Sequence, residues 1–328
     1  MLLLDGETLN FPRRGLTIPA GTIARWPVNL EVAGVRLRWA TASAFTLLDP
    51  DGAPTLVLAA EEGIVPQLCL PEGTVLDGPA TALGGGVYAV DGGGPVTLTA
   101  SSAEGSLAIL VLPSHLASQA WALETPHGRQ LVLSADPLWV GADGRLAGRS
   151  QGEPAVRRYS AEAGGFEDVR TGILKPEALR RTLPAERIRA SKPVPASFGS
   201  LAGRAAAPTG SSIDGLAAVY AVDLGAAVLS GEHTELEVAW AGDVARLVVD
   251  GTVVGDRFWD GSPWIIETND AGIRPGSDVR LQILPLAKDA QVGLPAEAQR
   301  RRDAAAGDLV SLDRLDLLQW TEWTEEPA

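Results

Sequence analysis

The feature that most restricts the fold of this chain is the frequency of turn-forming residues between short apolar runs. Its 328 residues include 37 Gly and 23 Pro. Glycine supplies the positive φ of tight turns, and proline interrupts helices. The runs between them are short and often alternate in polarity, which is typical of strands. We therefore predict an all-β fold of antiparallel β-sandwich or jelly-roll modules with few short helices.

Several segments carry this pattern clearly. Val35, Leu37 and Trp39 alternate with Arg36 and Arg38, as in a strand with one buried face. From residue 119 the pattern changes to hairpins. The paired runs that we predict are 121–124 with 130–133, 138–140 with 145–147 around Asp143–Gly144, and 156–159 with 166–169.

The C-terminal part contains a second set of strands. Leu236, Val238 and Trp240 share one face of a predicted strand, and Glu235 and Glu237 share the other. Residues 235–240, 246–249 and 252–254 follow one another across two turns, which predicts a three-stranded meander. Later strands are expected at 279–284 and 315–320. Residues 176–181 suit one short helix, and residues 295–306 fit either a short helix or a long polar loop.

These patterns divide the chain into four parts. Residues 1–118 form a predicted β-sandwich domain, and residues 119–190 form a hairpin-rich β region packed on it. Residues 191–212 are rich in Pro, Ala, Ser and Gly, and we expect a linker there. Residues 213–328 form the predicted jelly-roll module.

Charge and cysteine content exclude several classes of function. The formal net charge is −14, whereas nucleic-acid binders need a basic face, so we expect no nucleic-acid partner. Cys69 is the only cysteine and lies in an apolar run, so we predict a buried hydrophobic role. His115, His127 and His233 lie far apart without metal-ligand spacing. We therefore predict no metal site and no cofactor.

The first residues, Met-Leu-Leu-Leu-Asp, lack the basic region of a signal peptide, and no apolar stretch is long enough to span a bilayer. We expect a soluble, cytoplasmic protein without a membrane partner. There is no Gly-x-Ser-x-Gly motif. The chain has 41 carboxylates, but sequence distance does not show whether two of them face each other as in a glycosidase. No catalytic residue is therefore assigned.

Residues 256–264 (Asp-Arg-Phe-Trp-Asp-Gly-Ser-Pro-Trp) are the most informative segment. Aromatic faces cover the C–H faces of sugars, and neighbouring carboxylates accept hydroxyl protons. One interpretation is a carbohydrate-binding loop formed by Trp259, Trp264, Asp256, Asp260 and Arg257. The other is a structured corner in which the two tryptophans plug the end of a sandwich.

The same segment, together with residues 240–251 and 283–286, resembles the C-terminal jelly-roll, galactose-binding-like module of bacterial beta-galactosidases of glycoside hydrolase family thirty-five. Residues 16–22, 26–30 and 37–42 resemble the β domain that follows the catalytic barrel in that family. The resemblance therefore touches both ends of the chain. It implies two β regions of such an enzyme in their usual order.

The catalytic glutamates of that family lie on a (β/α)₈ barrel of about 250 residues, and this chain lacks the alternating pattern of such a barrel. No family glutamate can be carried over. We interpret the chain as an accessory, carbohydrate-associated or scaffold part of a split or truncated enzyme. The alternatives are an active glycoside hydrolase with an unrecognised carboxylate pair, and a purely structural interaction module.

The family-like sequence begins almost at Met1, which suggests that neighbouring strands are missing. Trp26, Val35, Leu37 and Trp39 would then belong to a sheet with an uncovered edge near Ala33. Unpaired edges and uncovered apolar surface favour association. We expect self-association, or binding to a separate catalytic barrel chain, through this region. The sequence does not identify the sugar.

Overall fold

The computed structural model describes residues 2–4, 7–9, 11–12, 15–49, 54–90, 93–175, 179–195, 200–201, 204–225 and 234–327. The protein is all-β, with 49% strand and 7% helix, which confirms the predicted fold class. The chain forms two compact units, which are described separately. Unit 1 comprises residues 1–175 and 322–328, and unit 2 comprises residues 176–321.

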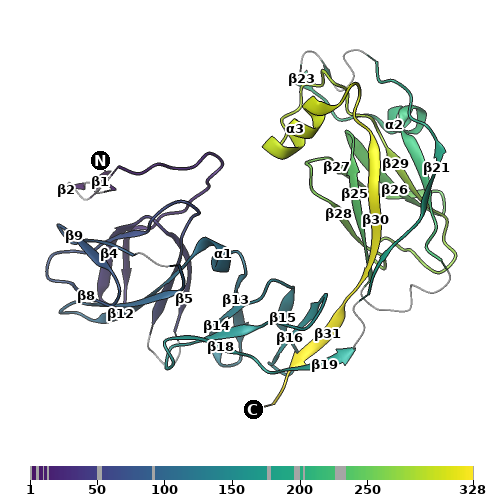
Figure 1. Ribbon diagram of the computed structural model, residues 1–328. Helices are drawn as coiled ribbons and strands as arrows, with labels where there is room; N and C mark the ends of the chain where they lie inside the picture. The colour runs from purple at the N-terminus through teal and green to yellow at the C-terminus, as the bar shows by residue number, and fades with distance from the viewer. Residues whose placement is uncertain are drawn as a thin grey trace. The chain divides into compact units, whose positions relative to one another are not determined.

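Unit 1 begins with a sandwich of two five-stranded sheets (Figure 1). One sheet has the order β3 (Val28–Val32), β4 (Val35–Ala40), β7 (Gln67–Cys69), β10 (Val87–Ala89), β9 (Thr81–Gly84). The facing sheet has the order β5 (Ser43–Leu48), β6 (Thr55–Ala59), β12 (Ser106–Leu112), β11 (Val96–Ser101), β8 (Val75–Asp77). The short strands β1 (Leu2–Leu4) and β2 (Glu7–Leu9) pair with each other.

Alternating residues of both sheets fill the core of this first sandwich. Leu37 of β4 and Leu58 of β6 are essentially inaccessible, as is Ile109 of β12. Burial of Cys69 confirms its predicted hydrophobic role. One pair departs from the predicted antiparallel arrangement, because β6 and β12 run parallel.

Ala33, near which the uncovered edge was predicted, lies in the turn between β3 and β4. Val35, Leu37 and Trp39 belong to β4, which has β3 on one side and β7 on the other. The edge strand of this sheet is β3, and Trp26 precedes it. The association expected through this region stays a prediction.

A second pair of sheets completes unit 1. One sheet has the order β13 (Ala120–Thr125), β14 (Gly128–Leu133), β17 (Arg157–Ser160), β18 (Gly165–Asp168). The other has the order β15 (Leu138–Val140), β16 (Leu146–Ser150), β31 (Thr321–Glu325), β19 (Thr171–Lys175). The three predicted hairpins are confirmed as β13–β14, β15–β16 and β17–β18. The helix α1 (Ser114–Ala117) precedes β13.

The last strand of the chain completes this second sandwich. Trp323 of β31 is buried beside Val132, Leu138 and Leu146. A Cβ on Gly148 would lie 2.3 Å from the Trp323 ring, so β16 needs glycine at this point. Unit 2 is therefore inserted in the chain between β19 and β31. The C-terminal strand, which the sequence-based division placed in the jelly-roll module, lies in unit 1.

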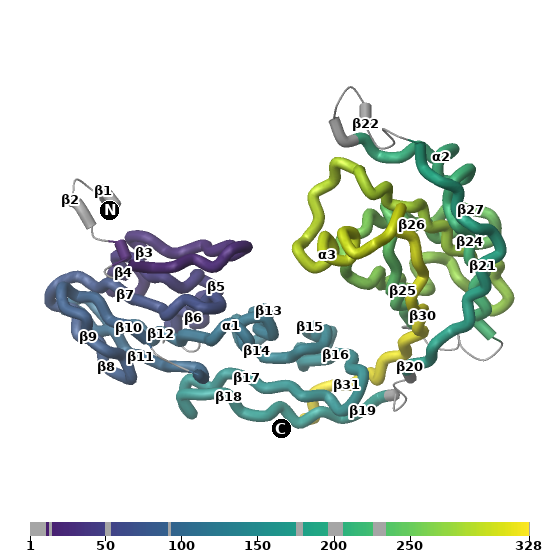
Figure 2. The backbone as a smooth tube through the Cα atoms, turned by 45° about the horizontal axis from the view of Figure 1, so that its top comes forward, coloured from purple at the N-terminus to yellow at the C-terminus, as the bar shows by residue number. Residues whose placement is uncertain are grey.

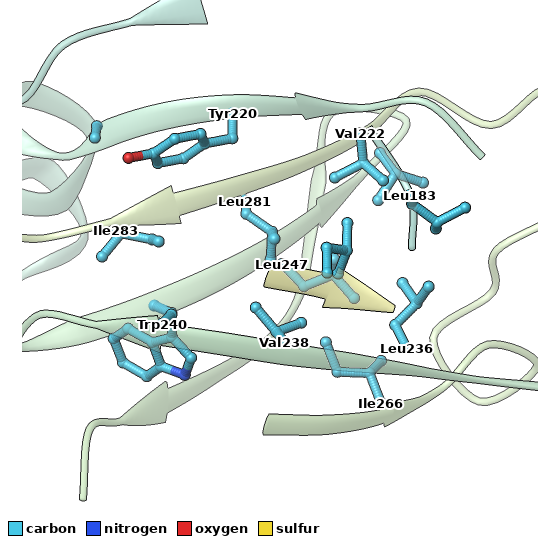
Figure 3. Packing of buried hydrophobic residues seen from close by; sticks show 14 of the residues in the cluster. Leu183, Tyr220, Val222, Leu236, Val238, Trp240, Leu247, Ile266, Leu281 and Ile283 are labelled. Carbon is cyan, nitrogen blue, oxygen red and sulfur yellow. The ribbon is translucent and has the colours of Figure 1, made fainter. Parts of the chain in front are cut away.

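Unit 2 is a sandwich of a four-stranded and a five-stranded sheet (Figure 2). The first has the order β20 (Leu179–Thr182), β30 (Ser311–Gln319), β25 (Thr234–Ala241), β28 (Trp264–Glu267). The second has the order β21 (Ala185–Arg189), β24 (Ala218–Val222), β29 (Val279–Ile283), β26 (Val244–Val249), β27 (Thr252–Phe258). Leu236 and Val238 face Leu247 and Leu281 across the core (Figure 3).

Helices and short strands flank this sandwich. The helix α2 (Gly210–Leu216) packs Ile213 against Val244 on the outer side of the five-stranded sheet. The helix α3 is Ala296–Ala304, which decides between the two structures considered for residues 295–306. The strands β22 (Ser200–Leu201) and β23 (Arg204–Ala205) form a small pair. The predicted linker at 191–212 thus contains secondary structure, and its residues 196–199 and 202–203 lie outside the described residues.

Two local predictions are wrong in unit 2. Of the predicted helix at 176–181, residues 176–178 lie outside the described residues, and residues 179–182 instead form the strand β20, because they pair with β30 at an edge of the four-stranded sheet. The predicted meander is also divided, because β25 lies in one sheet and the β26–β27 hairpin in the other. Gly242 allows this crossing, since a Cβ there would lie 2.6 Å from the Leu284 carbonyl oxygen.

The β26–β27 hairpin itself forms at the predicted Asp-Gly turn. Asp250 has φ 49° and Gly251 has φ 81°, the positive values that a two-residue hairpin turn requires. None of the described helices is long and apolar enough to cross a membrane.

Candidate functional site

The sequence-predicted site lies where unit 2 passes from one sheet to the other. β27 is the edge strand of the five-stranded sheet, and β28 is the edge strand of the four-stranded sheet. Residues 259–263 join them. The structure therefore brings all five predicted residues to one strand-loop-strand segment, although their side chains have different environments.

The two tryptophans pack inward. Trp259 is 5% exposed and belongs to the core of unit 2. Trp264 is half-buried against the same core, and its ring lies over Gly255 of β27. Both rings thus fill the space between the sheets, as the structured-corner interpretation describes. Their role in binding stays a prediction.

A compact polar cluster closes the loop on its exposed side. Arg257 donates hydrogen bonds to Asp260 Oδ2 at 3.1 Å and to Ser262 Oγ at 2.7 Å. Ser262 donates to Asp260 Oδ1 from its hydroxyl at 2.6 Å and from its backbone N–H at 2.9 Å. These bonds from Ser262, together with those from Arg257 and its charge, lower the pKa of Asp260 to about 2. The carboxylate stays ionised at any physiological pH.

Phe258 is the exposed aromatic ring of this segment, and the sequence argument did not select it. Its side chain is 55% exposed. Asp256, two residues earlier on β27, is also exposed and shares its face of the strand. Strand alternation is the sequence signal that could have identified Phe258. Neighbouring side chains of a strand point to opposite faces, so an inward Trp259 implies an outward Phe258.

The helix α3 covers the loop from another side. Ala298 packs against Gly261, where a Cβ would come within 2.9 Å of the alanine Cβ. The Arg301 guanidinium lies 5.8 Å from the centroid of the Trp259 ring. Arg301 also donates to Ser311 Oγ at 2.7 Å and to Asp313 Oδ1 at 2.9 Å, and both acceptors belong to β30.

These contacts favour the ionised form of the Asp313 carboxyl. Partial burial by itself would raise its pKa, but hydrogen bonds from Arg301 and Ser311 and the Arg301 charge outweigh burial. The pKa of Asp313 therefore lies below its usual value. The cation–π contact and the ion pair hold Arg301 between the loop and β30.

Two cavities lie in the first sandwich of unit 1. The larger, of about 360 Å³, is lined by polar side chains that include Glu31, Arg36, Glu72 and Glu104. The smaller, of about 180 Å³, has Ile64, Val65 and Pro113 in its lining. Neither cavity contains any of the five predicted site residues.

The described residues contain no group of three or more His, Cys, Asp or Glu side chains arranged to hold a metal ion. His115 lies on α1, and His127 is exposed in the β13–β14 turn. His233 lies outside the described residues. The geometry of residues 256–264 offers binding chemistry: an aromatic face, a fixed carboxylate and a fixed guanidinium.

Comparisons with known proteins add a distant structural likeness. No protein-family model matches the sequence, and no curated protein matches it. The fold is similar to part of a glycoside hydrolase, a beta-glucuronidase from Bifidobacterium dentium solved in complex with coumarin-3-O-glucuronide. The identity is 14% and the TM-score 0.21, over 47% of this chain and 30% of the enzyme. The chain thus spans less than a third of the protein it matches.

Proposed function

We propose that this chain is a non-catalytic, carbohydrate-associated β-sandwich region of a beta-galactosidase-like glycoside hydrolase, and that unit 2 binds a galactoside at residues 256–264. The observations that support the proposal are the exposed Phe258 ring, with the exposed Asp256 carboxylate on the same face of β27, and the Arg257–Asp260–Ser262 cluster at the loop that follows. This arrangement coincides with the segment that resembles the galactose-binding-like module of glycoside hydrolase family thirty-five.

The chemistry of this surface suits a pyranose. An exposed aromatic ring stacks on the C–H face of a sugar, while carboxylate oxygens accept its hydroxyl protons. Asp260 is already fixed by Ser262 and Arg257, so little side-chain entropy is lost when a ligand binds. We therefore assign the proposed stacking role to the exposed Phe258 rather than to the buried Trp259.

The test is a titration of the chain with methyl β-galactoside, followed by NMR chemical shifts. We expect weak binding that Phe258→Ala reduces about tenfold, because an aromatic contact contributes roughly 1–2 kcal/mol. The melting temperature should not change, since Phe258 is exposed. Arg280→Ala removes an exposed ion pair elsewhere on the same sheet and is the matched control. Absence of binding by the unaltered chain would refute the proposal.

The accessory role has its own test. A (β/α)₈ barrel places eight helices around its strands, whereas the described part of this chain has three short helices. We expect no hydrolysis of a chromogenic β-galactoside by the purified chain. Turnover that persists through purification and disappears when one carboxylate of this chain is substituted would favour the alternative, an active hydrolase. A separate barrel chain is the partner that an accessory role implies.

A further inference from the structure

We propose that α3 covers a cryptic sugar subsite formed by the ring of Trp259, the carboxylate of Asp313 and the hydroxyl of Ser311. In this structure the Arg301 guanidinium occupies the subsite. The inference rests on the proposed function, because it assigns a second set of contacts to the same loop.

The three groups around Arg301 have the composition of a pyranose site. The guanidinium lies 5.8 Å from the centroid of the Trp259 ring, so it covers a flat apolar surface. It is bonded at the same time to Ser311 and Asp313. Removal of Arg301 would leave an aromatic face, a carboxylate acceptor and a hydroxyl side by side, which is how proteins contact sugar C–H faces and hydroxyls.

The helix α3 makes few apolar contacts with the sandwich. The helix has nine residues, Ala-Glu-Ala-Gln-Arg-Arg-Arg-Asp-Ala, and contains no large apolar side chain. Only Ala298 and Arg302 are buried, and the N-cap Pro295 makes no side-chain capping bond. Elements with few buried apolar contacts open locally at a lower free energy than the core of the same domain.

Arg302 supplies the strongest attachment of α3. Its guanidinium donates to the carbonyl oxygens of Ala287 at 3.3 Å, Lys288 at 2.8 Å and Ala290 at 2.6 Å. These bonds join α3 to the segment at 287–290. The contacts that lie over the proposed subsite are those of Ala298 with Gly261 and of Arg301 with Trp259 and β30.

Trp259 offers a direct readout of the opening. Its indole N–H is buried and has no hydrogen-bond partner among the described residues. Because no hydrogen bond protects this N–H, its rate of exchange with solvent depends on how often the groups that bury it move away. The exchange rate of the Trp259 indole proton, assigned with Trp259→Phe, therefore reports the opening without any ligand.

The experiment compares Arg301→Ala with Arg300→Ala, a control on the exposed side of the same helix. Arg301→Ala should speed exchange of the Trp259 indole proton roughly three- to thirtyfold, the combined effect of a cation–π contact and a partly exposed ion pair. Apparent affinity for methyl β-galactoside should rise by the same factor, because it scales with the open fraction while closed molecules dominate. Arg300→Ala should change neither quantity.

The double variant Arg301→Ala/Asp313→Asn tests the carboxylate. It should keep the fast exchange and lose the gain in affinity. If Arg301→Ala does not fold, Arg301→Gln, which keeps the aliphatic stem, replaces it in both measurements.

Unchanged indole exchange in the Arg301 variant would show that α3 is no cover. Faster exchange without tighter binding would show that no sugar subsite lies beneath it. If guanidinium ion slows exchange of the indole proton and methyl β-galactoside does not, the subsite binds cations. That result would overturn the proposal that it binds a sugar. The proposed function is judged separately, by galactoside binding that depends on Phe258.

Discussion

The second sandwich of unit 1 and the sandwich of unit 2 both use tryptophan to fill the space between two sheets, but they enclose it differently. Trp323 enters on the last strand of the chain and lies directly over Gly148 of the neighbouring strand β16. Trp259 lies in a loop between edge strands and is covered by the short helix α3. We expect a purely structural role for the ring sealed by strands, whereas the proposed subsite requires that α3 uncover Trp259.

The largest effect should come from Trp323→Ala. Loss of a fully buried tryptophan costs about 3–5 kcal/mol, and the small core of this sandwich has few other large side chains to compensate. We expect early unfolding of unit 1 while unit 2 keeps its native stability, measured by residue-resolved hydrogen exchange in urea. Trp139→Ala, on the same sandwich but 43% exposed, is the control and should have little effect. Equal loss in both units would show that they unfold together.

Trp259→Ala should have the next largest effect. We expect the free energy of unfolding of unit 2 to fall by about 3 kcal/mol, with unit 1 unaffected. The ring belongs to the unit 2 core, but its cover by α3 lets part of the cavity collapse. Urea unfolding monitored by circular dichroism measures the change, with Phe258→Ala as the neighbouring exposed control. An unchanged unfolding midpoint would contradict the description of Trp259 as a core residue.

Asp316→Asn should destabilise unit 2 by about 1–3 kcal/mol at neutral pH. The Asp316 side chain is buried and accepts bonds from Thr182 and Arg180, each at 2.8 Å, with Arg314 at 3.0 Å. Burial alone would raise its pKa, but these bonds and charges outweigh burial and lower it.

The sign of the pH dependence follows from that lowered pKa. The stabilisation by Asp316 is complete above the unfolded pKa of about 3.9 and is lost as the pH falls through the lower folded value. The difference between Asp316→Asn and the unaltered chain should therefore shrink in acid. A difference that stays constant from pH 7 to pH 2 would show that charge plays no part.

The smallest effect should be a slight gain in stability from Asp243→Asn at pH 7. Burial raises the pKa of Asp243, so the folded state resists its ionisation. Such a group favours folding below its unfolded pKa, and this advantage is lost as the pH rises through the folded pKa. Thermal melts at pH 7 and pH 3 should show the gain only at pH 7. Destabilisation at pH 7 would instead reveal a structural role for the carboxylate.

Local signals predicted the strands and hairpins well because the responsible forces act between neighbouring residues. The Asp250–Gly251 turn needs only the positive φ that these residues tolerate. Likewise, the alternation of Leu236, Val238 and Trp240 with two glutamates fixed the buried face of β25. Part of the candidate site was predictable for the same reason: aromatic and acidic residues grouped at 256–264 lie on one continuous segment.

The sequence by itself thus determined the all-β class, the hairpins and the position of the unusual loop. Only the tertiary structure decided which sheet each strand joins. Local propensity cannot show that β20 pairs with β30, that β31 returns to unit 1, or that β25 and β26 separate at Gly242. Tertiary packing also exposed Phe258 and placed Arg301 over Trp259. The physical reason is that strand pairing and burial depend on contacts between residues distant in the chain. Turn chemistry and alternation depend only on neighbouring residues and carry no information about those contacts.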